Sequence, residues 1–154
     1  MSTETRPRKA HAVGINHLAL EVGDIDQALD FYAQFIVFDI HARSEDMAFI
    51  YFGDQFINFT VNNNRLADVD RHFGIAVDDY ELAKQTLIDM DVNFLEGPFL
   101  DFLDPWGNRV EITTYVDIQF SKTKEVLQGM GLGHLKKSDL ALSELKAKGM
   151  APED

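Results

Sequence analysis

Residues 16–24 read NHLALEVGD, and residues 71–79 repeat the pattern as RHFGIAVDD. In each copy a histidine, His17 or His72, begins an apolar run of strand character, and the run stops at an acidic residue that can cap a helix. A pattern that recurs at this spacing indicates two similar structural units in one chain. Histidines at equivalent places in equivalent units can be brought together by pseudo-symmetry, which favours a shared site over two isolated core histidines.

The composition limits what such a chain can be. With 154 residues, 45% of them hydrophobic, it can form one globular domain or two small fused modules. A net charge of −12 argues against nucleic acid or an anionic membrane as a partner, and no apolar run is long enough to span a bilayer. Residues 1–12 are predicted to be a flexible tail without a signal-peptide pattern. Because cysteine is also absent, we expect a cytoplasmic protein.

The first unit, residues 13–61, is predicted to have the order β-α-β-β-β. Asp24 caps its helix, and apolar residues at helical spacing form one face of that helix. The turn Gly53-Asp54 is typical of a two-residue hairpin. The predicted strands cover residues 13–22, 38–43, 47–52 and 55–61.

After a linker at residues 62–70, the second unit, residues 71–117, repeats this order. Asp79 takes the capping place, and the segment DPWGN at residues 104–108 forms the last turn. The predicted strands cover residues 71–77, 92–95, 99–103 and 109–115. Residues 118–154 are predicted to be a helical extension that caps the fold or adds to an interface, with short helices at residues 122–128 and 139–148.

Strand parity predicts which side chains share a face. The first hairpin pairs Tyr51 with Phe56, and the second hairpin, if Leu103 opposes Arg109, pairs Asp101 with Glu111. The first face would carry Met47, Phe49, Tyr51, Phe56, Asn58 and Thr60. The second face would carry Phe99, Asp101, Leu103, Arg109, Glu111, Thr113 and Tyr115.

Glu111 is a carboxylate within an apolar strand and needs a partner there. Together with His17 and His72 it would suit one divalent ion with open coordination positions: Fe²⁺, Mn²⁺, Ni²⁺, Co²⁺ or Zn²⁺. Such a site can polarise a bound oxygen. The alternative is that each histidine is a hydrogen-bonded strand residue and that Glu111 is an edge-strand or salt-bridged carboxylate. The repeat favours the metal site.

These motifs, with DPWGNRVE at residues 104–111, resemble those of the vicinal oxygen chelate superfamily over about residues 13–115. That superfamily includes glyoxalases, extradiol dioxygenases, fosfomycin-resistance enzymes and bleomycin-binding proteins. The resemblance implies an α+β fold of two tandem βαβββ modules forming a cupped mixed sheet, followed here by a short helical C-terminal tail. It also implies that His17, His72 and Glu111 are the metal ligands.

Several positions depart from particular branches of the superfamily. Asn58 stands where glyoxalases have a glutamate ligand, and Ala19 stands where fosfomycin-resistance enzymes have a threonine. The chain has two modules, whereas extradiol dioxygenases usually have four. We therefore transfer none of these substrates.

The resulting prediction is a divalent-metal-dependent enzyme that acts on a small substrate chelating through adjacent oxygens, by dioxygenase, isomerase or lyase chemistry. Asp101 or Tyr115 would be the acid–base residue. A solvated strand carboxylate is the alternative for Asp101, and ordinary packing is the alternative for Tyr115 and the other aromatic residues. The residues predicted to contact substrate are Phe49, Tyr51, Phe56, Asn58, Phe99 and Arg109.

Two other classes of protein remain open. A metal-free small-molecule binding protein of the bleomycin-resistance kind would use the same cup, although such proteins usually lack the ligand set. The metal could also be non-catalytic and serve folding or regulation. A closed site with four protein ligands would favour that interpretation. Two-module members of the superfamily commonly share sites between chains, so we expect a homodimer. The sequence leaves open whether His17 meets His72 within one chain or across two.

Overall fold

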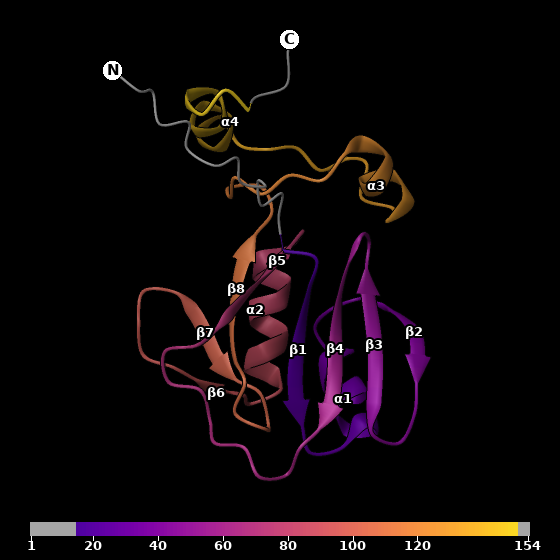
Figure 1. Ribbon diagram of the computed structural model, residues 1–154. Helices are drawn as coiled ribbons and strands as arrows, with labels where there is room; N and C mark the ends of the chain where they lie inside the picture. The colour runs from indigo at the N-terminus through magenta and orange to yellow at the C-terminus, as the bar shows by residue number, and fades with distance from the viewer. Residues whose placement is uncertain (1–14, 151–154) are drawn as a thin grey trace, which may run out of the picture.

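The computed structural model describes residues 15–150 (Figure 1). The predicted tail at residues 1–12, and residues 13 and 14 of the predicted first strand, lie outside the described part of the chain. The remaining elements confirm an α+β fold with two β-α-β-β-β modules and short helices after them. None of the described helices combines the length and the apolarity that a membrane crossing requires.

The first module forms a four-stranded mixed sheet in the order β1-β4-β3-β2, in which β1 is parallel to β4 and the other pairs are antiparallel. Its elements are β1 His17–Val22, α1 Ile25–Tyr32, β2 Asp39–Arg43, β3 Met47–Phe52 and β4 Gln55–Val61.

The second module repeats this topology with the order β5-β8-β7-β6, where β5 is parallel to β8. Its elements are β5 Phe73–Val77, α2 Tyr80–Asp89, β6 Asn93–Phe94, β7 Leu100–Leu103 and β8 Arg109–Thr114, followed by α3 Lys124–Gly129 and α4 Asp139–Ala147.

The helix caps predicted from the sequence are present. The Asp24 carboxylate accepts the backbone N–H of Gln27 at 2.8 Å, and the Asp79 carboxylate accepts that of Leu82 at 3.0 Å. Each cap satisfies one of the unpaired N–H groups at the start of its helix. The same chemistry therefore starts α1 and α2 at equivalent places in the two modules.

Both hairpins have the predicted register. Tyr51 pairs with Phe56 and Phe49 with Asn58 around Gly53, whose φ of 74° suits a residue without a Cβ. In the second hairpin Asp101 pairs with Glu111. Since paired residues share a face, each module has one face with the predicted site residues and an opposite face that is apolar.

The apolar faces of the two sheets contribute to one core together with α1 and α2. The side chains of Phe59 on β4 and Phe102 on β7 are fully buried in it. Tyr32 of α1 packs on Phe59 at 5.0 Å between ring centroids, and its hydroxyl donates to the Asp104 carboxylate of the second module at 2.9 Å. The predicted site faces of both sheets therefore point away from the core that the modules share.

The bond between Tyr32 and Asp104 joins the modules, so Tyr32→Phe should lower the free energy of unfolding by about 2 kcal/mol, as expected for a buried hydrogen bond to a carboxylate. Urea denaturation would measure it as a lower midpoint with an unchanged slope. Tyr80→Phe on α2 is the control, because no hydrogen bond of that hydroxyl to the described residues is present. Equal midpoints for the two variants would contradict the role of Tyr32.

Candidate metal site

The side chains of His72 and Glu111 lie next to each other in the second module. His72 Nε2 lies 3.7 Å from Glu111 Oε2, and His72 Nδ1 lies 3.0 Å from the carbonyl oxygen of Asp70. Because a carbonyl oxygen only accepts, Nδ1 carries the proton in neutral imidazole and Nε2 presents its lone pair to the carboxylate.

Two lone-pair atoms at this distance suit a cation between them. The separation of 3.7 Å is less than twice a typical bond of about 2.1 Å from a divalent metal to imidazole nitrogen or carboxylate oxygen, so one ion can reach both atoms. If His72 were protonated, the same contact would be the salt bridge that the sequence left as the alternative.

His17 has the same proton arrangement in the first module. Its Nδ1 lies 2.8 Å from the amide oxygen of Asn16, so Nδ1 donates and Nε2 keeps its lone pair. The imidazole stacks on Phe56 with ring centroids 4.7 Å apart and planes 8° apart. A hydrogen bond to the second nitrogen and a fixed ring plane are the usual support of a metal-binding histidine.

One chain does not bring the three predicted ligands together. Within residues 15–150 no group of three or more histidine, aspartate or glutamate side chains is arranged to hold a metal ion. His17 begins β1 of the first sheet, whereas His72 directly precedes β5 and Glu111 lies on β8 of the second sheet, and the two site faces point away from the common core. The residues fit a divalent ion in their chemistry, but the described chain contains the donor set in two separate parts.

Asp101 and Arg109 are paired with each other beside Glu111. The Arg109 guanidinium donates to Asp101 Oδ2 through Nε at 2.9 Å and also through Nη2, and its Nη1 donates to the carbonyl of Val69 at 2.7 Å. Asp101 is 4% exposed, and its Oδ1 has no hydrogen-bond partner among the described residues. Asp101 is thus a buried, paired carboxylate rather than a solvated one. Arg109 is occupied by Asp101 and by the carbonyl of Val69, which lies on the segment that leads to His72.

Tyr115 and Phe99 lie elsewhere. The Tyr115 hydroxyl accepts the backbone N–H of Lys122 at 3.0 Å, and the ammonium of Lys137 lies 3.4 Å from the ring centroid. Packing under the C-terminal extension therefore accounts for Tyr115, in agreement with the alternative interpretation of that residue. Phe99 precedes β7 and is 64% exposed, so it forms no wall in the described chain.

A row of rings crosses the site face of the first sheet. Phe56 stacks on Tyr51 with centroids 5.0 Å apart, and Tyr51 in turn lies 5.0 Å from His41 of β2. The sequence predicts His41 to be a surface residue, and it is exposed, next to a β-bulge between Ile40 and Ala42. Asn58, on the same face as Phe56, has a buried Oδ1 without a hydrogen-bond partner in the described chain.

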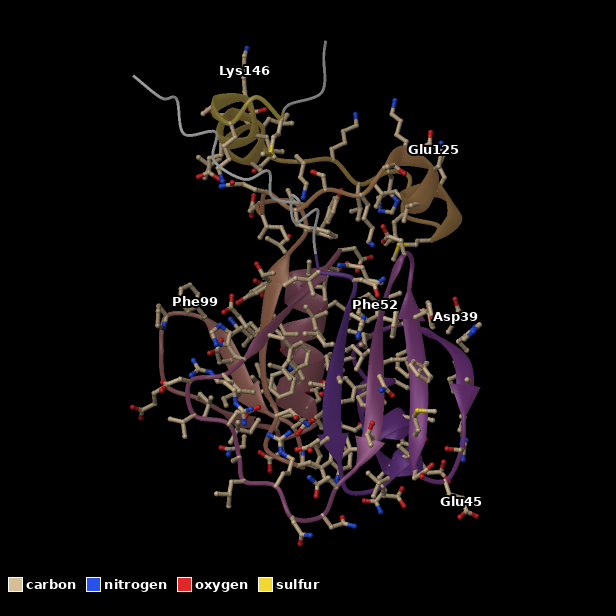
Figure 2. The ribbon with its side chains drawn as sticks, viewed as in Figure 1. Asp39, Glu45, Phe52, Phe99, Glu125 and Lys146 are labelled. Atoms are coloured by element: carbon tan, nitrogen blue, oxygen red, sulfur yellow. The ribbon has the colours of Figure 1, made fainter. Side chains whose placement is uncertain are left out.

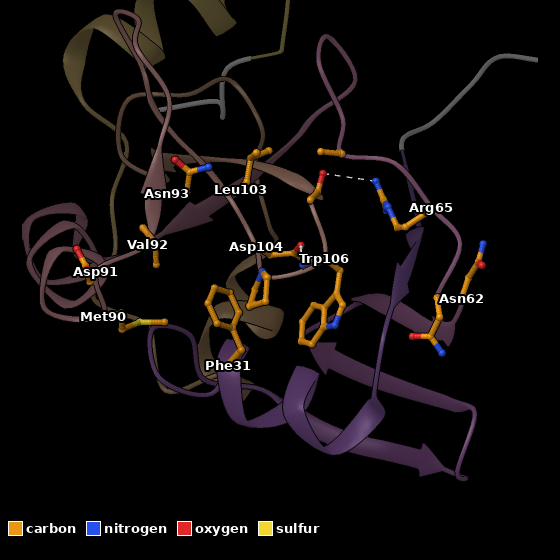
Figure 3. Close-up of a pocket in the computed structure, with 14 residues that line it drawn as sticks. Phe31, Asn62, Arg65, Met90, Asp91, Val92, Asn93, Leu103, Asp104 and Trp106 are labelled. Atoms are coloured by element: carbon orange, nitrogen blue, oxygen red, sulfur yellow. Dashed lines mark hydrogen bonds between the residues drawn. The ribbon is translucent and has the colours of Figure 1, made fainter.

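One cavity in the described part of the chain is separate from these residues. It measures about 750 Å³ and lies between α1, the linker and the turn after β7, with Phe31, Arg65 and Trp106 among its lining residues (Figure 3). It contains neither histidine, and its Arg65 is already ion-paired with Asp68 at 3.1 Å. Burial raises the pKa of the lining Asp104 carboxyl, but that group is hydrogen-bonded to Tyr32 and Asn108. The carboxylates among its lining residues are Asp91 and Asp104, and none of the predicted metal ligands lines it.

The sequence model of the glyoxalase/bleomycin resistance protein/dioxygenase superfamily matches residues 14–112. The chain belongs to this superfamily. A curated relative, glutathione transferase FosA of Serratia marcescens, is 28% identical over 110 residues, which cover 64% of this chain and 78% of that protein.

Solved structures of superfamily type share the fold. An integron cassette protein from the mobile metagenome of V. cholerae has a TM-score of 0.55 and 23% identity, covering 70% of this chain and 99% of its own. A lactoylglutathione lyase from Agrobacterium tumefaciens has a TM-score of 0.53 and 20% identity, and the match covers 68% of this chain and 95% of that protein. At these identities the likeness shows the fold alone. It covers nearly all of each neighbour, while almost a third of this chain remains outside it.

Because Asp101 and Arg109 form a buried ion pair, removing Arg109 alone should destabilise the fold more than removing both charges. Arg109→Gln should lower the free energy of unfolding by about 3 kcal/mol, because it leaves the Asp101 carboxylate buried without its cation. Urea denaturation should show that adding Asp101→Asn recovers part of this loss. Arg43→Gln, which breaks the exposed pair with Asp26, is the control and should cost less than about 1 kcal/mol. Strictly additive effects of the two substitutions would refute the coupling.

Proposed function

We propose that this chain is a divalent-metal-dependent enzyme acting on a small substrate that chelates through two adjacent oxygens. The observation that carries the proposal is the proton arrangement of the two repeated histidines. Both Nδ1 atoms face an oxygen acceptor, so in the neutral imidazoles each Nε2 would carry the lone pair, and Nε2 of His72 faces Glu111. Metal-binding histidines usually have such a hydrogen bond on the ring nitrogen that does not bind the metal.

We propose further that a second copy of the chain completes each site. The two halves of the donor set lie on outward faces of one chain, and both faces remain partly open to solvent. In a two-fold symmetric dimer, the His17 face of one protomer can meet the His72–Glu111 face of its partner, which gives two equivalent sites. Of the two arrangements that the sequence left open, we therefore propose the one in which each site is shared between two chains.

The donor set determines the chemistry available. Two neutral imidazoles and one carboxylate leave a bound divalent ion with a net charge of +1, which can stabilise negative charge developing on the oxygens of a substrate. Three protein ligands also leave coordination positions free for that substrate. The candidate metals remain Fe²⁺, Mn²⁺, Ni²⁺, Co²⁺ and Zn²⁺.

The chain's own residues supply the remaining steps. Asp101 is our candidate for the proton-accepting group, because its Oδ1 is unpaired among the described residues and it lies directly across the β7–β8 ladder from Glu111. Arg109 orients that carboxylate through Oδ2. The Asn58 amide and the rings of Phe49, Tyr51 and Phe56 would bind the substrate from the opposite face.

The reaction class follows from the metal and from oxygen consumption. Iron with oxygen uptake indicates a dioxygenase, whereas the other metals without uptake indicate isomerase or lyase chemistry. Two of the similar proteins have glutathione in their names, so we place glutathione conjugates beside catechols and hydroxy-carbonyl compounds in the first substrate panel. Asn58 in place of the glyoxalase glutamate argues against glyoxalase chemistry itself.

Metal analysis of untagged protein purified without oxygen tests the proposal. The parent should contain about one equivalent per chain, and His72→Ala should lose it because one imidazole ligand is removed. His134→Ala, in the C-terminal extension, is the matched control and should retain the metal. A parent that stays metal-free after reloading with each candidate ion would contradict the enzyme proposal and favour the metal-free binding protein.

A further inference from the structure

The helical extension beyond β8 contacts both modules. The match to the superfamily model ends at residue 112, so α3 and α4 lie outside the matched part of the chain. Figure 1 shows α3 above the β3–β4 hairpin and α4 above the end of β8. In Figure 2, Phe52 at the end of β3 lies below the helix that carries Glu125.

The first contact of the extension is with the end of the strand that carries Glu111. The backbone N–H of Lys122 donates to the Tyr115 hydroxyl at 3.0 Å, and the N–H of Ser138 donates to the carbonyl of Val116 at 2.9 Å. The Lys137 ammonium donates to the carbonyls of Tyr115 and Phe120, and burial lowers its pKa to about 8. The extension is therefore firmly attached to the segment immediately after β8.

The second contact is with the turn of the first hairpin. The Lys122 ammonium forms an ion pair with the Asp54 carboxylate, and this pairing lowers the pKa of Asp54. The lysine side chain is only 8% exposed, although its partner is 55% exposed. Met130 Sδ lies so close to Gly53 that a Cβ there would be 2.6 Å away. Lysine is rarely buried unless it is paired. The buried Lys122 side chain therefore connects the C-terminal extension to the turn of the first hairpin and is not an ordinary surface charge.

The hairpin turn is directly linked to the residues that orient His17. Gln55 Nε2 donates to the carbonyl of Ile15 at 2.7 Å, and the backbone N–H of Phe56 donates to the carbonyl of Asn16 at 3.4 Å. Phe56 then stacks on the His17 ring, and Asn16 accepts its Nδ1 proton. Movement of the turn would therefore displace both contacts that set the plane of the imidazole.

We propose that Lys122 is a positioning residue for the metal site. Its backbone N–H and its ammonium tie the end of the Glu111 strand to the hairpin that orients His17, which keeps the imidazole ready to bind metal. This inference rests on the proposed function. If sites are shared between protomers, the two groups tied by one extension belong to different sites, so each dimer needs both extensions for two ordered sites.

Substitutions at the ion pair test this role. Lys122→Met keeps the aliphatic stem and the backbone N–H but removes the ammonium, and Asp54→Asn removes the exposed charge of its partner. Lys122→Arg is the conservative variant, and Arg43→Met is the matched control, because it breaks the exposed Arg43–Asp26 pair of the same module. Two quantities are measured in the purified full-length chain: Co²⁺ affinity by chelator competition, and the NMR shift of His17 Hε1, which the stacked Phe56 ring perturbs.

We expect Lys122→Met and Asp54→Asn each to weaken Co²⁺ binding about tenfold, the lower end of the range for groups that support metal ligands. Both should move the His17 signal, and the double variant should be no worse than either single variant. Lys122→Arg and Arg43→Met should stay close to the parent in both measurements.

The two measurements separate this inference from the proposed function. A parent that binds Co²⁺, with Lys122→Met and Asp54→Asn that bind it equally well and leave the His17 signal in place, would overturn the positioning role alone. A parent that binds no metal would overturn the proposed function. In that case the His17 signal still decides whether the extension acts on the imidazole.

Discussion

The hydrogen bond from the Tyr32 hydroxyl to the Asp104 carboxylate is a buried polar contact that joins the helix of the first module to the last turn of the second. Burial raises the pKa of Asp104, and the carboxylate is stabilised there by the backbone N–H groups of Trp106 and Asn108 as well as by Tyr32. A buried carboxylate without these donors would be costly. The turn at residues 104–108 thus has a structural role, because its Asp104 carboxylate accepts a hydrogen bond from a helix of the other module.

This packing has a direct consequence for the reactive groups. Because Tyr32 and Phe59 bring the apolar faces of both sheets into one core, the faces with His17 and with His72–Glu111 are turned outward. In the proposed function these faces are two half-sites, and in each the Nδ1 atom of the histidine faces an oxygen acceptor, which leaves Nε2 of the neutral imidazole for a metal. Assembly of two chains is the step that would turn these halves into a site, and the C-terminal extension would keep their geometry.

The sequence was sufficient for features that local physics determines. The caps at Asp24 and Asp79 and the hairpin register around Gly53-Asp54 follow from side-chain and turn chemistry within a few residues, and the structure confirms them. The sequence was not sufficient to predict the surroundings of a side chain where those surroundings depend on contacts between distant segments. Strand parity put Tyr115 on the site face, but the extension added 22 residues later, through Lys137, covers it. Parity also placed Asp101 and Arg109 on one face without showing that they pair with each other.

The central claim, a metal site shared between two chains, is tested most directly by mixing two inactive variants. His17→Ala and His72→Ala homodimers should each have no complete site. After subunit exchange, a mixed dimer should have one site that lacks both histidines and one intact site. Random exchange makes about half of the dimers mixed, so the mixture should regain about one quarter of the parent's tightly bound metal. No recovery, in a mixture shown by mass spectrometry to contain the heterodimer, would contradict the shared site.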